Sequence, residues 1–331
     1  MKPRTLRARL AAAVLALTTP VAHAQPIPTP DHVVIVIEEN HTYSQIIGSS
    51  SAPYINGLTS QGALLTNSFA ITHPSQPNYL ALFSGSTQGV TSDNTPTNLP
   101  FTTPNLGAQL LGAGRTFVGY SESLPSVGFT GDNAGGSGGY WRKHNPWVNW
   151  QQIGSPPYPP NNLPATVNQP FTAFPIDYST LPTLSIVVPN QINDMHDGTI
   201  AQADTWLRNN LDGYIQWAKT HNSLFIMTFD EDDFAGTNRI PGILVGGVVR
   251  TGVTSNQVIN HYGMLATLED MYGLGRIANS VGQAPLTGIW VSPVPEPSSI
   301  VLVGAAGVGV AVRIWRRGRM RTYVSQPGDI S

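Results

Sequence analysis

Residues 32–40 read HVVIVIEEN, an apolar run that ends abruptly in two carboxylates and an amide. The run is nearly continuous rather than alternating, which is typical of a strand that is covered on both faces of a sheet. Two later runs have the same character, LSIVV over Leu184–Val188 and SLFIMTF over Ser223–Phe229. We therefore expect three buried strands at the centre of one sheet.

The segments between these runs predict helices and further strands. TFVGY over 116–120 and GILVGGVV over 242–249 are strand candidates, and the predicted helices cover 78–83, 105–113, 200–221 and 261–272. Strands that alternate with helices indicate an α/β fold, a three-layer sandwich around a mostly parallel β-sheet. The stretches 91–104 and 131–178, rich in Pro, Gly and Asn, are predicted to be surface excursions.

Polar side chains follow each of the three strong strands. EEN follows the first, NDMHDGT (193–199) the second, and DEDD (230–233) the third. The carboxyl ends of parallel strands share one edge of a sheet, where ligands bind. One such cluster alone favours a solvated turn, but three in one chain favour a shared site.

A serine lies where a loop is predicted to become a helix, in THPSQPNYLALFSG (72–85). Pro77 suits the first turn of a helix, where its missing N–H costs nothing. The free N–H groups and the dipole of a helix start favour a phosphate or an oxyanion next to Ser75. A simple N-cap is the alternative interpretation of Ser75. The nearby His73 and Asn78 favour a nucleophile instead.

A serine hydroxyl needs a base or a metal ion to become a strong nucleophile. A cation held by Glu39, Asp230 and Glu231 can ionise it and neutralise charge on a phosphoryl group. The departing alkoxide needs a proton, which His196 or His73 can supply because histidine titrates near working pH. The sequence leaves the choice between these two histidines open.

Five separated motifs resemble one known family. SQPNYLALFSG, VVIVIEEN, NDMHDGT, FDEDD and NHYGMLATLED together are similar to the phosphoesterase family of acid phosphatases and bacterial phospholipases C, which is related to the alkaline phosphatase superfamily. The resemblance extends from about residue 31 to about residue 275. It implies an alkaline phosphatase-like fold.

The resemblance also implies a metal site. Ser75 matches the nucleophile that becomes a transient phosphoserine and contacts the metal, and the other implied ligands are Glu39, Asn40, Asp230 and Glu231. FDEDD stands where better-known phosphatase relatives have an Asp-His pair. We therefore expect one divalent ion, Mg²⁺, Ca²⁺, Mn²⁺ or Zn²⁺, of which the first three suit oxygen ligands best. Asp232 and Asp233 are interpreted as a solvated turn.

Further residues are implied around the substrate. Asn78 matches a donor to a phosphoryl oxygen, His196 and Asp197 match a polar pair near the leaving group, and His261 lies in another matching motif. The segment YWRKHNPW (140–147) resembles the acid phosphatase branch. It can bring Arg142, Lys143 and His144 to the substrate phosphate, and its alternative is an aromatic-packed surface loop. His73 is also expected at the substrate, and Glu122 is expected to point towards the site.

The two ends of the chain carry targeting signals. Basic residues, the run LAAAVLAL and the small residues AHA predict a signal peptide over 1–24, so the catalytic domain is expected over 25–290. VPEP, an apolar run over 300–312 and an arginine cluster resemble the PEP-CTERM sorting signal, assigned to 291–331. The apolar run predicts a short transmembrane helix. The resemblance implies processing by an exosortase, transient anchoring in the inner membrane, and delivery to the cell surface or matrix.

Composition narrows the function. The chain has no cysteine, which excludes disulfides and thiolate metal sites. Residues 25–293 contain 8 Lys and Arg against 17 Asp and Glu, a net charge of −9, which argues against nucleic acid as a partner. We predict an exported, metal-dependent phosphoesterase, an acid phosphatase that hydrolyses phosphate monoesters of small molecules. The alternatives are a phospholipase C-type phosphodiesterase and a non-catalytic surface protein on the same scaffold. A sulfatase relative is disfavoured because no CxPxR-type motif is present.

Overall fold

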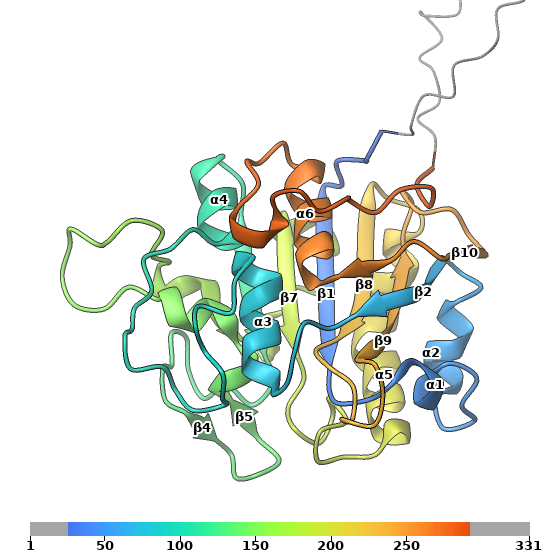
Figure 1. Cartoon of the computed structure of the whole chain (residues 1–331), viewed down its shortest axis with the longest axis horizontal. Coiled ribbons are helices and arrows are strands. Elements are labelled where there is room, and N and C mark those ends of the chain that lie inside the picture. The colour runs from blue at the N-terminus through green and yellow to red at the C-terminus, as the bar shows by residue number, and fades with distance from the viewer. Residues whose placement is uncertain (1–25, 292–331) are drawn as a thin grey trace, which may run out of the picture. The chain divides into compact units, whose positions relative to one another are not determined.

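The computed structural model describes residues 26–291 and places a nine-stranded sheet at its centre (Figure 1). The strand order is β10-β2-β9-β8-β1-β7-β3-β6, and β11 also pairs with β2. Their bounds are β1 His32–Glu38, β2 Ala63–Phe69, β3 Phe117–Ser121, β6 Asn168–Pro170, β7 Leu184–Val188, β8 Ser223–Phe229, β9 Arg239–Val245, β10 Val253–Ser255 and β11 Ile259–Asn260. Only β9 runs antiparallel to its neighbours in this sheet, so the sheet is mostly parallel. A separate two-stranded pair is formed by β4 Asn133–Ala134 and β5 Tyr140–Trp141.

The central strand β1 lies between β7 and β8 and pairs with both in parallel register. Ile35 is opposite Ile186 on one side and Ile226 on the other. Glu38, the last residue of β1, pairs with Phe229, the last residue of β8. The polar residues that follow these two strands therefore start from the same level at one edge of the sheet.

Helices cover both faces of the sheet, which confirms the predicted three-layer α/β fold (Figure 1). Alternate residues of β1 face opposite layers: Val33 and Ile35 pack in the core with α3, α4 and α6, and Val34 and Val36 pack in the core with α1, α2 and α5. The helices are α1 Tyr43–Ile46, α2 Pro53–Leu58, α3 Ser75–Ser84, α4 Leu106–Gly112, α5 Ile200–Ala218 and α6 His261–Met271. The short 3₁₀ helices are η1 Arg142–His144, η2 Pro146–Trp150, η3 Ala165–Val167, η4 Phe171–Ala173, η5 Tyr178–Thr180 and η6 Ala278–Ser280.

Helix α3 is buried along its whole length. It begins at Ser75, three residues before the predicted start, with Pro77 in its first turn. It ends at Gly85, whose φ of 68° lies in the left-handed region that favours glycine. A Cβ at Gly85 would also lie 2.6 Å from the carbonyl oxygen of Ile277. The C-terminal end of α3 is thus fixed by the surrounding structure.

Two sequence predictions about elements are correct only in part. The strand predicted over 242–249 is β9 at Arg239–Val245, because Gly246 and Gly247 leave the sheet in a turn that approaches the carbonyl oxygens of Ser223 and His221. The segment 131–178, predicted to be a surface excursion, packs into the core at η1 and η2. Trp147 and Trp150 are fully buried there, and Lys143 and His144 are almost fully buried.

The predicted signal peptide, the apolar run 300–312 and the basic tail lie outside the described residues. Among the described helices, none has the length and apolar content needed to cross a bilayer.

Candidate active site

The residues after β1 and β8 come together at one edge of the sheet. Glu39 and Asn40 follow β1, and Asp230 and Glu231 follow β8. The backbone N–H of Asn40 donates to Asp230 Oδ1 at 3.1 Å, which ties the two segments together. Asn40 has a φ of 52°, a conformation that asparagine tolerates better than most residues.

Ser75 lies at the first residue of α3, against these carboxylates. Its hydroxyl donates to Glu39 Oε2 at 3.1 Å and lies 3.4 Å from Glu231 Oε1. The second oxygen of Glu39 accepts a hydrogen bond from the Tyr79 hydroxyl, one turn further along α3. Ser75, Glu39, Asp230 and Glu231 are all buried. The nucleophile and ligands predicted from widely separated motifs therefore occupy one place.

The chemistry of this cluster fits a hard divalent cation. Asn40 Oδ1 and Asp230 Oδ2 are buried without a hydrogen-bond partner in the described part of the chain. Burial raises the pKa of Glu39, and the charges of Asp230 and Asp194 raise it further. Burial likewise raises the pKa of Asp230, and burial followed by the charge of Asp230 raises that of Glu231. Buried carboxylates with spare oxygens are the ligands that Mg²⁺, Ca²⁺ and Mn²⁺ prefer.

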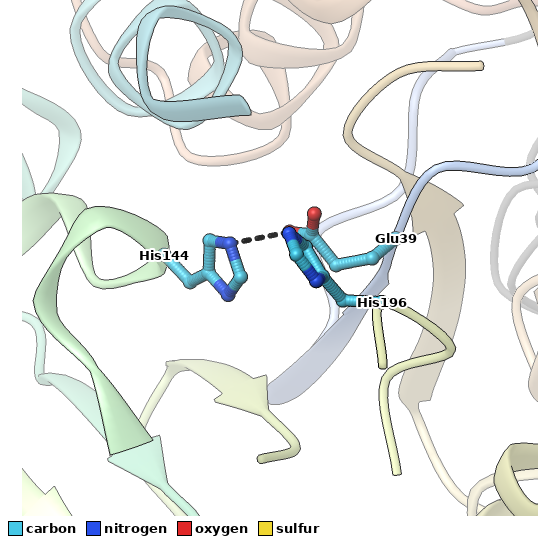
Figure 2. A group of neighbouring side chains, drawn as sticks. All are labelled: Glu39, His144 and His196. Atoms are coloured by element: carbon cyan, nitrogen blue, oxygen red, sulfur yellow. Dashed lines mark ion pairs between the residues drawn. The ribbon is translucent and has the colours of Figure 1, made fainter. Parts of the chain in front are cut away.

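Two histidines adjoin the same cluster. The donor atoms of Glu39, His144 and His196 lie within 4.8 Å of one another, so this group can also hold a metal ion (Figure 2). His144 Nε2 is 3.2 Å from Glu39 Oε1. Burial, followed by the charges of Lys143 and His196, lowers the pKa of His144, which keeps the imidazole neutral and able to act as a ligand. Sequence reasoning expected both histidines near the substrate but missed this group, because its members are distant in the chain.

Lys143 brings a positive charge to the site. Its Nζ lies 3.0 Å from Asp93 Oδ2 and 3.2 Å from His196 Nε2. Burial by itself lowers the pKa of Lys143, but the charges of Glu39 and Asp93 outweigh it and the net shift is upward. The other ring nitrogen of His196, Nδ1, lies 2.7 Å from Asp197 Oδ1. His196 is thus held between an ammonium group and a carboxylate.

Asp194 connects three parts of the site, and sequence reasoning did not single it out. Its carbonyl oxygen accepts from the Glu39 N–H at 2.7 Å, and Oδ1 accepts from the His196 N–H at 2.8 Å. Its Oδ2 lies 3.5 Å from His144 Nδ1, and the residue is fully buried. Met195, which links Asp194 to His196, has a φ of 80°, a strained value for a residue other than glycine.

Two other predicted residues, Asn78 and His73, support the walls of the site. Asn78 donates to Thr72 O and Glu231 Oε2, and its Oδ1 accepts from the N–H groups of Ile71 and Thr72. His73 is held by two carboxylates, with Nδ1 2.9 Å from Glu231 and Nε2 3.2 Å from Asp232. Its ring also stacks on Phe234.

His261 lies behind the cluster rather than in an open space. Its Nε2 is 2.7 Å from the carbonyl oxygen of Asp230. Burial lowers the pKa of His261 to about 4, so the ring is neutral and supports the backbone of Asp230.

The remaining acidic residues have structural partners. Glu122 accepts from the Asn190 N–H, the Asn193 amide and the Trp206 indole, so the expectation that it points into the site is wrong. Asp232 accepts from the N–H groups of Phe234 and Asn238 in a local turn, but it is fully buried, so the prediction of a solvated turn is wrong for this residue.

The chain is similar in sequence to known proteins. Residues 49–275 match the Phosphoesterase family, and residues 293–317 match the PEP-CTERM protein-sorting motif. A phosphatidylinositol-3-phosphatase of Mycobacterium tuberculosis is 49% identical over 269 residues, which cover 81% of this chain and 85% of that protein. A phosphate-repressible acid phosphatase of Penicillium chrysogenum is 33% identical over 232 residues, which cover 66% of this chain and 54% of the fungal protein.

The fold has solved counterparts as well. A protein in the alkaline phosphatase superfamily from Vibrio parahaemolyticus aligns with a TM-score of 0.53 and 13% identity, covering 80% of this chain and 73% of that one. At this identity the likeness concerns the fold alone, and it confirms the predicted fold class.

Proposed function

Since the chain belongs to the phosphoesterase family and is a hydrolase of phosphoric esters, we propose that it cleaves phosphate monoesters through a phosphoserine at Ser75 with the help of a divalent cation. The observation that carries this proposal is the position of the Ser75 hydroxyl, 3.1 Å from Glu39 Oε2 and 3.4 Å from Glu231 Oε1. A nucleophile at a helix start, beside buried carboxylates that need a counter-charge, suits attack on a phosphoryl group.

The cation would be held by the oxygen-rich cluster, with Glu39, Asn40, Asp230 and Glu231 as ligands next to Ser75. The unpartnered Asn40 Oδ1 and Asp230 Oδ2 support this choice. When bound, the ion would favour ionised Ser75 and neutralise charge on the phosphoryl oxygens.

In the first half of the reaction, Ser75 Oγ attacks phosphorus, the new O–P bond forms, and the bond from phosphorus to the ester oxygen breaks. We assign His196 as the acid that protonates the departing alkoxide. Both ring nitrogens of the alternative, His73, lie against the carboxylates of Glu231 and Asp232. His196 differs in that only its Nδ1 lies against a carboxylate, that of Asp197, whereas its Nε2 faces the Lys143 ammonium group. In the second half, a water oxygen attacks phosphorus and gives a proton to His196, the bond from phosphorus to Ser75 Oγ breaks, and inorganic phosphate is released with Ser75 regenerated.

A monoester is the favoured substrate because of Lys143. Its ammonium group lies beside His196 with a raised pKa, so it stays charged near the bound phosphate. A terminal phosphate carries more negative charge than a diester and gains more from this neighbour. The Mycobacterium tuberculosis relative is a phosphatidylinositol-3-phosphatase, so we include phosphorylated inositol head groups among the proposed substrates.

The sorting motif supports export with transient anchoring in the membrane. We propose that signal peptidase removes residues 1–24, that an exosortase processes the segment 291–331, and that the catalytic domain 25–290 acts at the cell surface or in the matrix.

The test of the nucleophile is Ser75→Ala, compared on a nitrophenyl phosphate monoester and the matching diester. We expect the wild type to prefer the monoester, and the variant to lose at least roughly a thousandfold in kcat. Mass spectrometry of the acid-quenched wild type should find phosphate on Ser75. Ser84→Ala is the matched control, because Ser84 is equally buried at the other end of α3 and bonds only within that region. A Ser75→Ala variant with near-normal turnover would refute the mechanism, and a preference for the diester would refute the substrate class.

A further inference from the structure

A cavity lies next to the candidate active site, at the start of β9. It has a volume of about 230 Å³, several times the roughly 30 Å³ that one water occupies in the liquid, and Thr42, Tyr43, Ser44, Thr237 and Arg239 line it together with Asp232 and Gly236. Because β9 is antiparallel to β8, its first residue, Arg239, is at the edge where β8 ends. Asp232 belongs both to this cavity and to the candidate active site, since its Oδ1 is also 3.2 Å from His73 Nε2.

Arg239 is held rigidly in this cavity. Its Nε donates to the carbonyl oxygen of Thr66 at 2.7 Å, and its guanidinium carbon lies 4.1 Å from the centre of the Tyr43 ring. The two terminal nitrogens have no hydrogen-bond or ion-pair partner among residues 26–291. Arg276, by contrast, uses its terminal nitrogens on Asp270 and on two carbonyl groups. A fixed guanidinium with free donors is preorganised for an anion.

The surroundings of Arg239 also favour an anion. Ser44 and Thr237 add hydroxyl groups to the lining. The one carboxylate in the lining, Asp232, accepts from the N–H groups of Phe234 and Asn238 and makes no ion pair with Arg239. A planar guanidinium with neighbouring hydroxyls matches the oxygens of a phosphate group.

We propose that this cavity binds a second phosphate group of the substrate, so that the enzyme favours compounds with two phosphates over compounds with one. The inference rests on the proposed function, since the first phosphate must be the one attacked by Ser75. Arg239 would then be a specificity-determining residue. The same cavity could instead take only free inorganic phosphate, and the experiment separates these sources.

The experiment uses a series of α,ω-alkanediol bisphosphates of increasing chain length, with the matching monophosphates. For one range of lengths, we expect kcat/KM of the wild type to be higher for the bisphosphate. Arg239→Gln should reduce this ratio about tenfold, mainly through KM, as for the loss of one or two charge-assisted hydrogen bonds. Arg239→Lys should restore only part of it, because lysine keeps the charge but not the planar fork.

Arg115→Gln is the matched control. Arg115 also stacks on a tyrosine, with its guanidinium 4.6 Å from the Tyr272 ring, but it precedes β3 and lies at the opposite edge of the sheet. We expect this variant to keep the bisphosphate ratio. If Arg239→Gln does not fold, Ser44→Glu tests the same cavity. It leaves the Arg239 contacts intact and adds a carboxylate, and Ser44→Gln is its neutral counterpart.

Equal kcat/KM for bisphosphates and monophosphates of every length would overturn the proposal, as would an equal loss on both classes in Arg239→Gln. Binding of inorganic phosphate that depends on Arg239 without any bisphosphate preference would also overturn it. Failure of the proposed function would look different, because the wild type would then not hydrolyse the monophosphates either.

Discussion

At the scale of single residues, the site is a set of carboxylates arranged around one hydroxyl. Glu39 has the central position, since its Oε2 accepts from Ser75 and its Oε1 faces Tyr79 and His144. One side chain therefore connects the oxygen-rich cluster to the two histidines. The function of the site therefore depends on how the side chains around Glu39 are oriented as well as on which side chains they are.

Asp194 is the residue that we expect to set this orientation. Its Oδ2 faces Nδ1 of His144 at 3.5 Å, which favours the tautomer whose Nε2 lone pair points into the site. Asp194→Asn should keep the fold but lower kcat/KM by about 10–100-fold, as is usual for groups that orient a ligand. The ¹⁵N chemical shifts of His144 should change with it, because an amide no longer fixes the tautomer.

The control is Asp204→Asn, another buried aspartate that accepts backbone N–H groups, here those of Tyr54 and Ile55. It should lower stability without changing the His144 signals or kcat/KM. If Asp194→Asn changed stability only, with the tautomer and kcat/KM unaltered, Asp194 would have no role in positioning.

Sequence patterns could predict the site residues that follow strong strands. They could not predict the residues that reach the site only through tertiary packing. Ser75, Glu39, Asp230 and Glu231 were predicted because each lies directly at an element boundary. His144 was predicted only as a substrate contact, and Asp194 was not considered. Their roles depend on how segments that are 50 to 155 residues apart meet, which a local pattern does not record.

At the scale of elements, β1, β7 and β8 were predictable because they are buried on both faces and therefore continuously apolar. β2 was missed because ALLTNSF mixes polar and apolar residues, and its burial also alternates. The segment 140–151 was misjudged because it lies within the stretch 131–178, whose overall content of Pro, Gly and Asn resembles that of an exposed loop. Its tryptophans instead pack into the core beside α3 and β3.

Gly119 in β3 is what allows that segment to pack. A Cβ there would lie 2.1 Å from the indole of Trp147. Trp147 belongs to η2, which directly follows η1, the 3₁₀ helix that contains Lys143 and His144. Gly119→Ala should therefore lower the free energy of unfolding by about 1–3 kcal/mol through overpacking. Displacement of His144 should also lower kcat/KM, by about tenfold or more.

Thermal unfolding and steady-state kinetics on the same preparations test this prediction. Gly57→Ala is the control, because Gly57 lies in α2 with nothing within 4 Å of an added Cβ. That change should be neutral or stabilising, since alanine favours a helix over glycine. Normal stability and kinetics in Gly119→Ala would show that Trp147 does not position the segment.

At the scale of the whole molecule, negative charge dominates and is concentrated where the sheet ends. The described residues carry Glu38, Glu39, Asp194, Asp230 and Glu231 in buried positions at this edge. Burial raises the pKa of each of these groups, which means that ionisation of all five carboxyl groups destabilises the folded protein. Lys143 supplies one compensating charge, which is too little for five carboxyl groups.

A bound divalent cation should therefore stabilise the whole fold as well as support catalysis. An ion that binds only the folded state at a hundred times its Kd adds about 2.7 kcal/mol, which should raise Tm by roughly 5–10 °C for a domain of this size. Chelation should lower Tm by this amount. Stepwise addition of Mg²⁺, Ca²⁺, Mn²⁺ or Zn²⁺ should restore it, and Tm should rise in proportion to the logarithm of the free ion concentration.

Asp230→Asn should abolish the dependence of Tm on the ion, because it removes a ligand charge from the cluster. Asp177→Asn is the control, since Asp177 is exposed and caps a surface turn, so the response to the ion should persist. A Tm that is indifferent to chelator and to all four ions would mean that the buried carboxylates are balanced by protons instead, and the metal-dependent mechanism would then be wrong.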